Sequence, residues 1–298
     1  MQESLILKNI NPTVLLRILD KFRDSKIDVI VPIYNAYDEL CQCIESLIKY
    51  RNCYDIILVN DCSNDSRINN LLAQLDENYD FIKIINNASN IGNINSVNLG
   101  MRSSNNDIIL LNSDTVVTPG WANKIRHCAY LDGNIATVTP LTNNGTICSI
   151  PKFLENNDIP QGFSIDSFGE FIEKISLRKY PEIPTAVGFC MYIKRKIIED
   201  VGYYDNLTYG RGYCAENDFC MRCINKGYKN VLCDDTFIFH KGGVSFLGVK
   251  NNIYQENLSE NMKILLNRYP DYMNIVRQFC ESNPLKEIHE NINFHLSH

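Results

Sequence analysis

Five residues that could catalyse a reaction or bind a metal are spread through the chain: Asp61, Asp114, Glu216, Asp218 and His240. Each follows an apolar stretch of strand length or begins an expected helix, and in a parallel sheet such positions meet at one edge. Carboxylate oxygens, with an imidazole nitrogen, can bind a hard divalent cation that neutralises a departing diphosphate. The pattern therefore predicts a cation site made by Asp114 and His240, beside a further carboxylate.

Each of these residues also has a structural interpretation. Asp61 could cap the helix that follows it, and a single histidine such as His240 is more often a core or turn residue. Asp218 and Arg222 are four residues apart on an expected helix, which favours an ion pair over catalysis for Asp218. Glu216, at the start of that helix, suits the helix dipole. Their joint order indicates a functional site more strongly than any one of them.

Buried strands alternating with helices are expected to position these side chains in the first half of the chain. The apolar strands are expected at 28–32, 54–61, 81–87 and 108–111. The last of them delivers Asp114 to its carboxyl end. Apolar residues at helical spacing lie between the strands, with Asp38 as the expected cap of the first helix. This alternation predicts an α/β fold with a mainly parallel, Rossmann-like sheet and helices on both faces.

The second half of the chain has a less regular pattern. A strand and a polar loop are expected at 136–151, and residues 151–183 look irregular except for a short helix near 168–175. Such an insertion often forms a lid or an acceptor wall. The remaining expected elements are a strand at 185–195, a short helix ending at Gly202, a helix at 216–226 and a last strand that turns at His240. Apolar spacing also predicts a helix within 1–25 and two helices beyond 250.

Composition excludes several classes of protein. The 298 residues, 45% of them hydrophobic, suffice for a substantial core, and a net charge of −6 argues against nucleic-acid binding. No apolar run approaches the length needed to cross a bilayer, so a cytosolic protein is expected. The 12 cysteines are expected to be free thiols. Cys220 and Cys223 are interpreted as helix-packing residues because no second pair has matching spacing.

Several motifs for phosphate binding and nucleophilic catalysis do not occur in the sequence. It contains neither the GxxxxGK[ST] loop nor the GxSxG elbow. Gly210-x-Gly212-x-x-Ala215 matches the letters of the dinucleotide fingerprint, but it does not join a first strand to its helix. We interpret it as a flexible loop before Glu216 and not as a cofactor site.

Seven short segments occur in the order found in one enzyme family. They are VPIYNA (31–36), VNDCSND (59–65), NASNIGNINSVNLG (87–100), LLNSDTVV (110–117), GFCMYIKR (188–195), GRGYCAENDFCMR (210–222) and FHKGGVSF (239–246). Through them the chain resembles the inverting glycosyltransferases of family 2, which have the GT-A fold. The resemblance implies a main domain at 26–248, with a nucleotide-binding half at 26–117 and an acceptor and catalytic half at 118–248. Helical extensions at 1–25 and 249–298 flank that domain.

The resemblance also implies the ligands and the residues that bind them. The donor is a nucleoside-diphosphate sugar of UDP or dTDP type, and the cofactor is a divalent metal ion, Mn²⁺ or Mg²⁺. The implied donor-binding residues are Pro32, Tyr34, Asp61, Asn90, Gly92, Asn112, Ser113 and Gly188. Asp114 and His240 are the implied metal ligands, and Glu216 is the implied catalytic base. Asn112 replaces the first acid of the family's DxD motif, and Asn217 follows Glu216 where an acid is usual.

The implied reaction inverts the configuration at the anomeric carbon of the sugar. It extends a surface polysaccharide, a lipid-linked oligosaccharide or a glycoprotein. The alternative is a non-catalytic glycosyltransferase-like module that binds a nucleotide or sugar, which the missing first acid favours. A nucleotidyltransferase is a third interpretation, but residues 31–39 have neither the glycine nor the lysine that its phosphate loop requires. The terminal helices could contact the inner face of a membrane or a second subunit, although ordinary packing is the simpler expectation.

Overall fold

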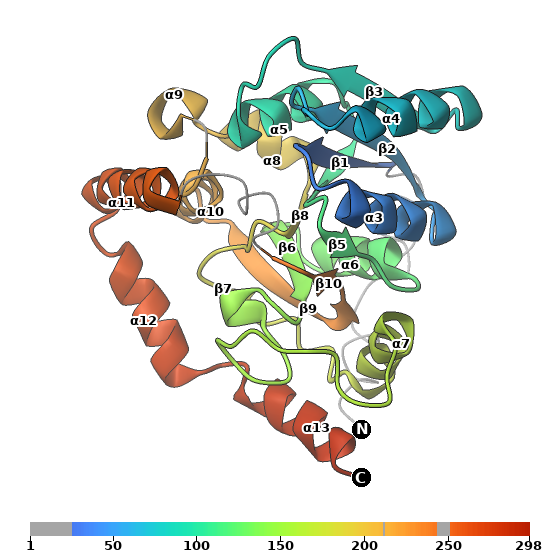
Figure 1. Cartoon of the computed structure of the whole chain (residues 1–298). Helices are drawn as coiled ribbons and strands as arrows, with labels where there is room; N and C mark the ends of the chain where they lie inside the picture. Colours follow the sequence, from blue (N-terminus) through green and yellow to red (C-terminus); the bar gives the residue numbers. More distant parts are fainter. Residues whose placement is uncertain (1–25, 211, 243–250) are drawn as a thin grey trace, which may run out of the picture.

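The computed structural model describes residues 26–210, 212–242 and 251–298, which form a central sheet flanked by helices (Figure 1). The strands of this sheet are β1 (Ile27–Ile33), β2 (Tyr54–Asn60), β3 (Ile82–Asn86), β4 (Asp107–Leu111), β6 (Ile135–Leu141), β7 (Glu182–Ile183), β8 (Cys190–Ile193) and β9 (Lys229–Phe237). They lie in the order β3-β2-β1-β4-β8-β6-β9-β7. A separate small sheet pairs β5 (Thr115–Val116) with β10 (Phe239–His240).

The sheet is mainly parallel, as the alternation of strands and helices predicts. β1 pairs in parallel with β2 and β4, β2 pairs in parallel with β3, and β6 pairs in parallel with β9. β8 is antiparallel to both of its neighbours, β4 and β6. The carboxyl ends of β1, β2, β3 and β4 therefore lie along one edge, and the loops that follow them meet there.

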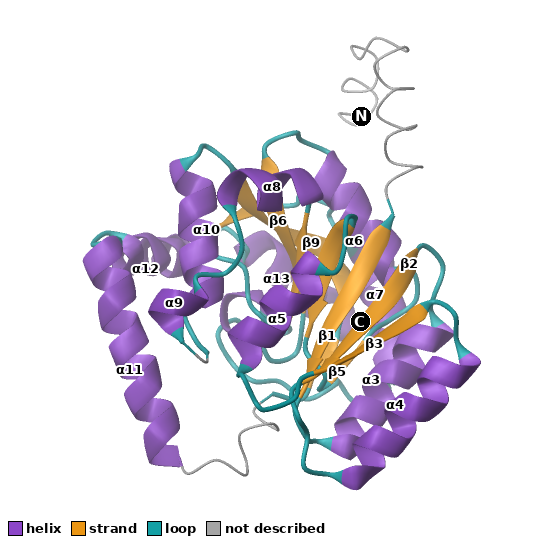
Figure 2. Cartoon of the chain, turned by 90° about the horizontal axis from the view of Figure 1, so that it is seen from above, coloured by secondary structure: helices purple, strands orange, loops and turns teal. Residues whose placement is uncertain are grey.

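Helices cover both faces of the sheet (Figure 2). One face packs against α3 (Tyr37–Lys49), α4 (Ser66–Asn78) and α6 (Trp121–Tyr130), and the other against α5 (Asn93–Arg102), α8 (Arg195–Val201) and α10 (Ala215–Asn225). The short α9 (Asn206–Tyr209) lies next to α5, and α7 (Ile165–Ile175) packs on β9. A 3-10 turn, η2, spans Thr146–Cys148. Beyond residue 250, α11 (Asn251–Arg268), α12 (Tyr272–Ser282) and α13 (Lys286–Leu296) follow one side of the molecule from α10 to α7 (Figure 1).

Branched aliphatic residues explain why the central strands form and stay buried. Val29, Ile30 and Val31 in β1 have no exposed surface, and alternate residues of a strand face opposite sides of a sheet. Burying each such side chain contributes about 1.5–3 kcal/mol. On one side, α5 approaches β1 so closely that a Cβ at Gly100 would lie 2.4 Å from Ile30 Cγ2. Glycine at this position therefore permits the close packing of α5 on the sheet.

The predicted cap at Asp38 is wrong, and so is the alternative interpretation of Asp61 as a cap. Asp38 lies inside the first turn of α3, and the N-cap is Ala36 in the left-handed conformation, because the chain turns sharply after β1. Asp61 does not cap α4, since Asp65 accepts the capping hydrogen bond from the Arg67 amide at 3.0 Å. The side chain of Asp61 is thus available for another role.

The structure confirms some of the other expectations and differs from one of them. The helix near 168–175 is confirmed as α7, and all 12 cysteines are free, with Cys220 and Cys223 buried. The sequence indicated two helices beyond residue 250, but the structure has a third, α13. The helix expected within 1–25 lies outside the described residues. Among the described helices, none combines the length and the apolar character required to span a membrane.

Candidate active site

The pairing of β5 with β10 brings Asp114 and His240 together. His240 pairs with Thr115, so its ring reaches the carboxylate of the preceding residue, Asp114. The distance from His240 Nε2 to Asp114 Oδ1 is 3.5 Å, and the two side chains are 14% and 8% exposed. The two residues that the sequence indicates as metal ligands are therefore neighbours, and their binding of a metal stays a prediction.

Three groups fix the orientation of the His240 ring. His240 Nδ1 lies 2.6 Å from the backbone carbonyl of Asn144. The Asn143 side chain bonds to the His240 backbone twice, accepting from its N–H at 2.8 Å and donating to its carbonyl at 3.1 Å. Phe189 stacks on the ring, with 5.2 Å between centroids and 19° between planes. Because a carbonyl only accepts hydrogen bonds, Nδ1 carries the proton of the neutral ring, and Nε2 presents its lone pair to Asp114.

The two facing groups, His240 Nε2 and the Asp114 carboxylate, suit a divalent cation as ligands. The lone pair of His240 Nε2 and the carboxylate of Asp114 are both acceptors, so they repel each other unless a cation or a proton lies between them. A histidine whose other nitrogen donates to a carbonyl is typical of metal-binding histidines. Within 26–210, 212–242 and 251–298, no group of three or more His, Cys, Asp or Glu side chains forms a metal cluster. A hard divalent cation takes six or more ligands, so further oxygen atoms would join Asp114 and His240 around it.

Glu216 lies in the first turn of α10 and beside Gly188. A Cβ added to Gly188 would be 3.8 Å from Glu216 Cδ, and Gly188 itself is exposed. The next residue, Phe189, stacks on His240 and accepts a 2.8 Å hydrogen bond from the Asn112 amide. Residues 188 and 189 thus border Glu216 on one side and the Asp114–His240 pair on the other, which places both groups along one segment of chain.

Glu216 is half-buried, and this partial burial affects its pKa. Desolvation raises the pKa of its carboxyl above the ordinary value, and a backbone hydrogen bond partly opposes this effect. A raised pKa makes the ionised carboxylate a stronger base. It also reduces the ionised fraction in mildly acidic solution.

The loop after β1 carries Tyr34 and is joined to the loop after β2. The Asn35 amide donates to Ser63 Oγ at 3.0 Å, and the Asn64 amide donates to Asn35 Oδ1 at 2.9 Å. Asn64 Nδ2 also lies 3.5 Å from the Tyr34 hydroxyl. Pro32 precedes this turn and is half-buried. The two loops therefore form one unit at the carboxyl edge of the sheet.

Asp61 holds the loop that follows β3. Its Oδ1 accepts from the Ile91 amide at 2.7 Å and from Asn87 Nδ2 at 3.0 Å, and its Oδ2 accepts from the Gly92 amide at 2.8 Å. Gly92 has a φ of 90°, which favours glycine. The carboxylate of Asp61 is buried, and both of its oxygens accept hydrogen bonds from this loop. Its role toward a nucleotide stays a prediction.

The other predicted donor-binding residues lie along the same edge. Asn90 belongs to the loop that Asp61 holds, and Asn112 and Ser113 lead from β4 to Asp114. The Asn112 carbonyl accepts from Thr115 Oγ1 at 2.7 Å. A cavity of about 560 Å³ opens between β2, β3 and α4, and its lining includes Asn60, Cys62, Ser63, Asn69, Asn86 and Asn87.

Two features of this region were missed or left open by the sequence. Asn143 and Asn144 appeared only as part of a polar loop, although consecutive asparagines after a strand could have drawn attention to that turn.

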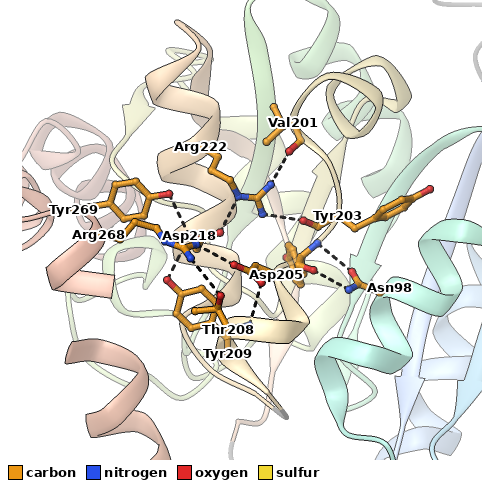
Figure 3. A network of polar contacts seen from close by, with 11 residues as sticks. Asn98, Val201, Tyr203, Asp205, Thr208, Tyr209, Asp218, Arg222, Arg268 and Tyr269 are labelled. Carbon is orange, nitrogen blue, oxygen red and sulfur yellow. Dashed lines mark hydrogen bonds and ion pairs between the residues drawn. The ribbon is translucent and has the colours of Figure 1, made fainter. Parts of the chain in front are cut away.

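Asp218 is fully buried, and its Oδ2 accepts from Arg222 Nε at 2.8 Å, which confirms the expected ion pair (Figure 3). Gly210 and Gly212 lie in the loop before α10, outside any first βα turn.

Comparisons with known proteins agree with this architecture. A family model described as "Glycosyl transferase family 2" matches residues 28–202. The uncharacterized glycosyltransferase YwdF of Bacillus subtilis is 26% identical over 79% of this chain and 83% of its own length. An uncharacterized glycosyltransferase of Haemophilus influenzae is 34% identical over 43% of this chain, and the match spans only 36% of that relative.

A solved structure shares the fold at low sequence identity. The crystal structure of GalNAc-T7 with UDP, GalNAc and Mn²⁺ has a TM-score of 0.62 and 15% identity, covering 91% of this chain and 54% of that one. Its similarity establishes the GT-A arrangement of the sheet and helices. Because the family model covers more than half of the 298 residues, the chain belongs to glycosyl transferase family 2.

Proposed function

We propose that the protein is a metal-dependent inverting glycosyltransferase. In this proposal it moves a sugar from a nucleoside-diphosphate sugar of UDP or dTDP type to a hydroxyl of a glycan, lipid-linked or protein-linked acceptor. The main support is the position of Gly188 and Phe189 between Glu216 and the Asp114–His240 pair. That arrangement can present a base and a cation site to one bound donor.

Glu216 is proposed to act as the general base. Its ionised carboxylate accepts the proton of the acceptor hydroxyl while the oxygen attacks the anomeric carbon from the face opposite the diphosphate. Attack from that face inverts the configuration of the sugar. Desolvation raises the pKa of Glu216, so activity should decline with falling pH earlier than it would for an ordinary glutamate.

Asp114 and His240 are proposed to hold a divalent cation. When bound, the cation would supply positive charge beside the diphosphate. Asn112 is proposed to donate a hydrogen bond to the donor, and the exposed backbone of Gly188 leaves space for the sugar. Pro32, Tyr34, Asp61, Asn90 and Gly92 are proposed to form the nucleotide side of the pocket. The presence of UDP and Mn²⁺ in the GalNAc-T7 structure supports a donor of UDP type.

Substitution of Glu216 by glutamine tests the proposed base. The variant should lose transfer and donor hydrolysis by about 10²–10⁴-fold, the usual contribution of a general base, while UDP still raises its Tm in Mn²⁺. Wild-type turnover would be sought with a panel of UDP, dTDP and GDP sugars. Turnover by Glu216→Gln at the wild-type rate removes Glu216 from this role.

The alternative is a binding module without catalysis, and the presence of Asn112 in place of an acid favours it. Thermal shifts with UDP, dTDP and GDP, with and without Mn²⁺, separate the two functions. A metal-dependent nucleotide shift that Asp114→Ala abolishes, together with donor turnover, supports the enzyme. A nucleotide shift that is independent of metal, without turnover of any donor, supports the binding module.

A further inference from the structure

The buried carboxylate of Asp218 lies two residues beyond Glu216 on the same helix. It has no exposed surface and accepts four hydrogen bonds. Its Oδ2 accepts from Arg222, and its Oδ1 accepts from Arg268 Nη1 at 2.7 Å, from the Tyr269 hydroxyl at 3.1 Å and from the Tyr209 hydroxyl at 3.3 Å. A buried carboxylate requires such compensation because desolvation penalises its charge.

Arg268, the last residue of α11, connects three helices. Its Nη1 bonds Asp218 on α10 and also Asp205 Oδ2, 3.0 Å away, at the start of α9. Its Nη2 donates to Thr208 Oγ1 at 3.2 Å. Figure 3 shows this guanidinium between the two carboxylates, with Tyr209 and Tyr269 beside it. The hydrogen bond that Arg268 donates to Asp218 raises the pKa of Arg268, so the guanidinium stays charged.

Two further contacts tie the C-terminal helices to the segment that carries Glu216. Asn261 Nδ2 on α11 lies 2.5–3.1 Å from the backbone carbonyls of Tyr209, the last residue of α9, and of Gly212 and Tyr213 in the loop before α10. On the other side of Glu216, Asn217 Nδ2 donates to the Tyr272 hydroxyl of α12 at 2.8 Å. Contacts from α11 and α12 therefore flank Glu216 on both sides in the sequence.

These contacts come from beyond residues 28–202, the part of the chain that the family model matches. We propose that Arg268 is a positioning residue for Glu216, through which α11 fixes the orientation and the electrostatic surroundings of the base. The inference rests on the proposed function, in which Glu216 removes the acceptor proton. Arg268 acts through Asp218 and does not itself contact the reacting atoms.

The charge of Arg268 provides a distinctive prediction. Without it, Asp218 keeps Arg222 and two neutral hydroxyl donors, so more uncompensated negative charge remains in the helical turn that also carries Glu216. A nearby negative charge raises the pKa of a carboxyl. Arg268→Met should therefore move the acidic limb of the kcat/KM profile to higher pH by at least about 0.5 unit. It should also lower kcat by about 10–100-fold through misplacement of the base, with the donor KM within about twofold of wild type.

Two companion variants separate positioning from general stability. Arg268→Lys keeps the charge, so its acidic limb should match wild type while kcat falls less than in Arg268→Met. Arg277→Met is the matched control, because Arg277 is an exposed arginine of α12 that donates to Asn274 on the same helix at 2.7 Å. That control should leave kcat and the pH profile unchanged.

Amide exchange measures positioning without catalysis. The Asp218 amide donates to the Cys214 carbonyl at 2.9 Å in the first turn of α10. Its exchange should accelerate at least about tenfold in Arg268→Met and not in Arg277→Met. If Arg268→Met does not fold, Arg268→Lys and Tyr269→Phe replace it in this measurement, with smaller accelerations expected.

The positioning role is overturned if the Asp218 amide exchanges at the control rate in these variants and the acidic limb stays at its wild-type pH. Failure of the proposed function gives a different result. In that case wild type turns over none of the nucleotide sugars, while the exchange rate of the Asp218 amide still decides whether α11 holds α10.

Discussion

Replacing Asn143 by alanine tests how the structure holds the Asp114–His240 pair. The buried side chain of Asn143 exchanges two hydrogen bonds with the His240 backbone, at 2.8 and 3.1 Å, and donates to the Asn157 carbonyl at 3.2 Å. Alanine removes all three and leaves the His240 N–H without its acceptor. A buried polar group left unpaired costs about 1–3 kcal/mol. We therefore expect the free energy of unfolding to fall by about 2–3 kcal/mol.

The adjacent residue provides a matched control. The half-buried Asn144 donates from its side chain to the Lys241 carbonyl at 3.2 Å, a hydrogen bond that is exposed to solvent. Its backbone carbonyl, which receives His240 Nδ1, survives substitution by alanine. Asn144→Ala should therefore cost no more than about 1 kcal/mol and leave the His240 ring in place.

Urea unfolding and a titration with Mn²⁺ in the presence of UDP, followed by electron paramagnetic resonance, compare the two variants. Asn143→Ala should weaken Mn²⁺ binding by about 10–100-fold, as expected for loss of a group that orients a metal-binding histidine. Asn144→Ala should bind Mn²⁺ like wild type. The reasoning is refuted if both variants unfold at the same urea concentration and bind Mn²⁺ equally well.

Two further predictions concern stability. Asp61→Ala removes the acceptor of the Ile91 and Gly92 amides, so it should cost at least about 2 kcal/mol in urea unfolding, against about 1 kcal/mol for loss of the helix cap in Asp65→Ala. Equal costs contradict this role of Asp61. Burial lowers the pKa of Lys194 to about 8 from 10.5, so its charge destabilises the fold below pH 8 and stability should rise between those values. In Lys194→Met the free energy of unfolding should rise less over this pH range. The prediction is wrong if the variant and wild type differ by the same free energy of unfolding at every pH.

The sequence predicted the core of the fold well, because the signals there are local. Uninterrupted aliphatic runs such as Ile108–Leu111 are typical of strands buried on both faces, and the helices between them show apolar residues at helical spacing. The cap of α3 was predicted wrongly because Asn35 and Ala36 adopt positive φ values. Glycine is the residue type that indicates such a backbone conformation clearly, and neither residue is glycine. Helix α13 was missed because its packing on α7 depends on distant parts of the chain.

The sequence by itself determined which side chains stand at strand ends and helix starts, because hydrophobic periodicity fixes where each element stops. It therefore indicated Asp61, Asp114, Glu216 and His240 as candidates. Only the tertiary structure decided which partners they meet. The pairing of β5 with β10 brings His240 to Asp114, the loop after β3 occupies both oxygens of Asp61, and α11 supplies Arg268 to Asp218. These contacts join segments that no local pattern relates, so they arise only when the whole chain packs.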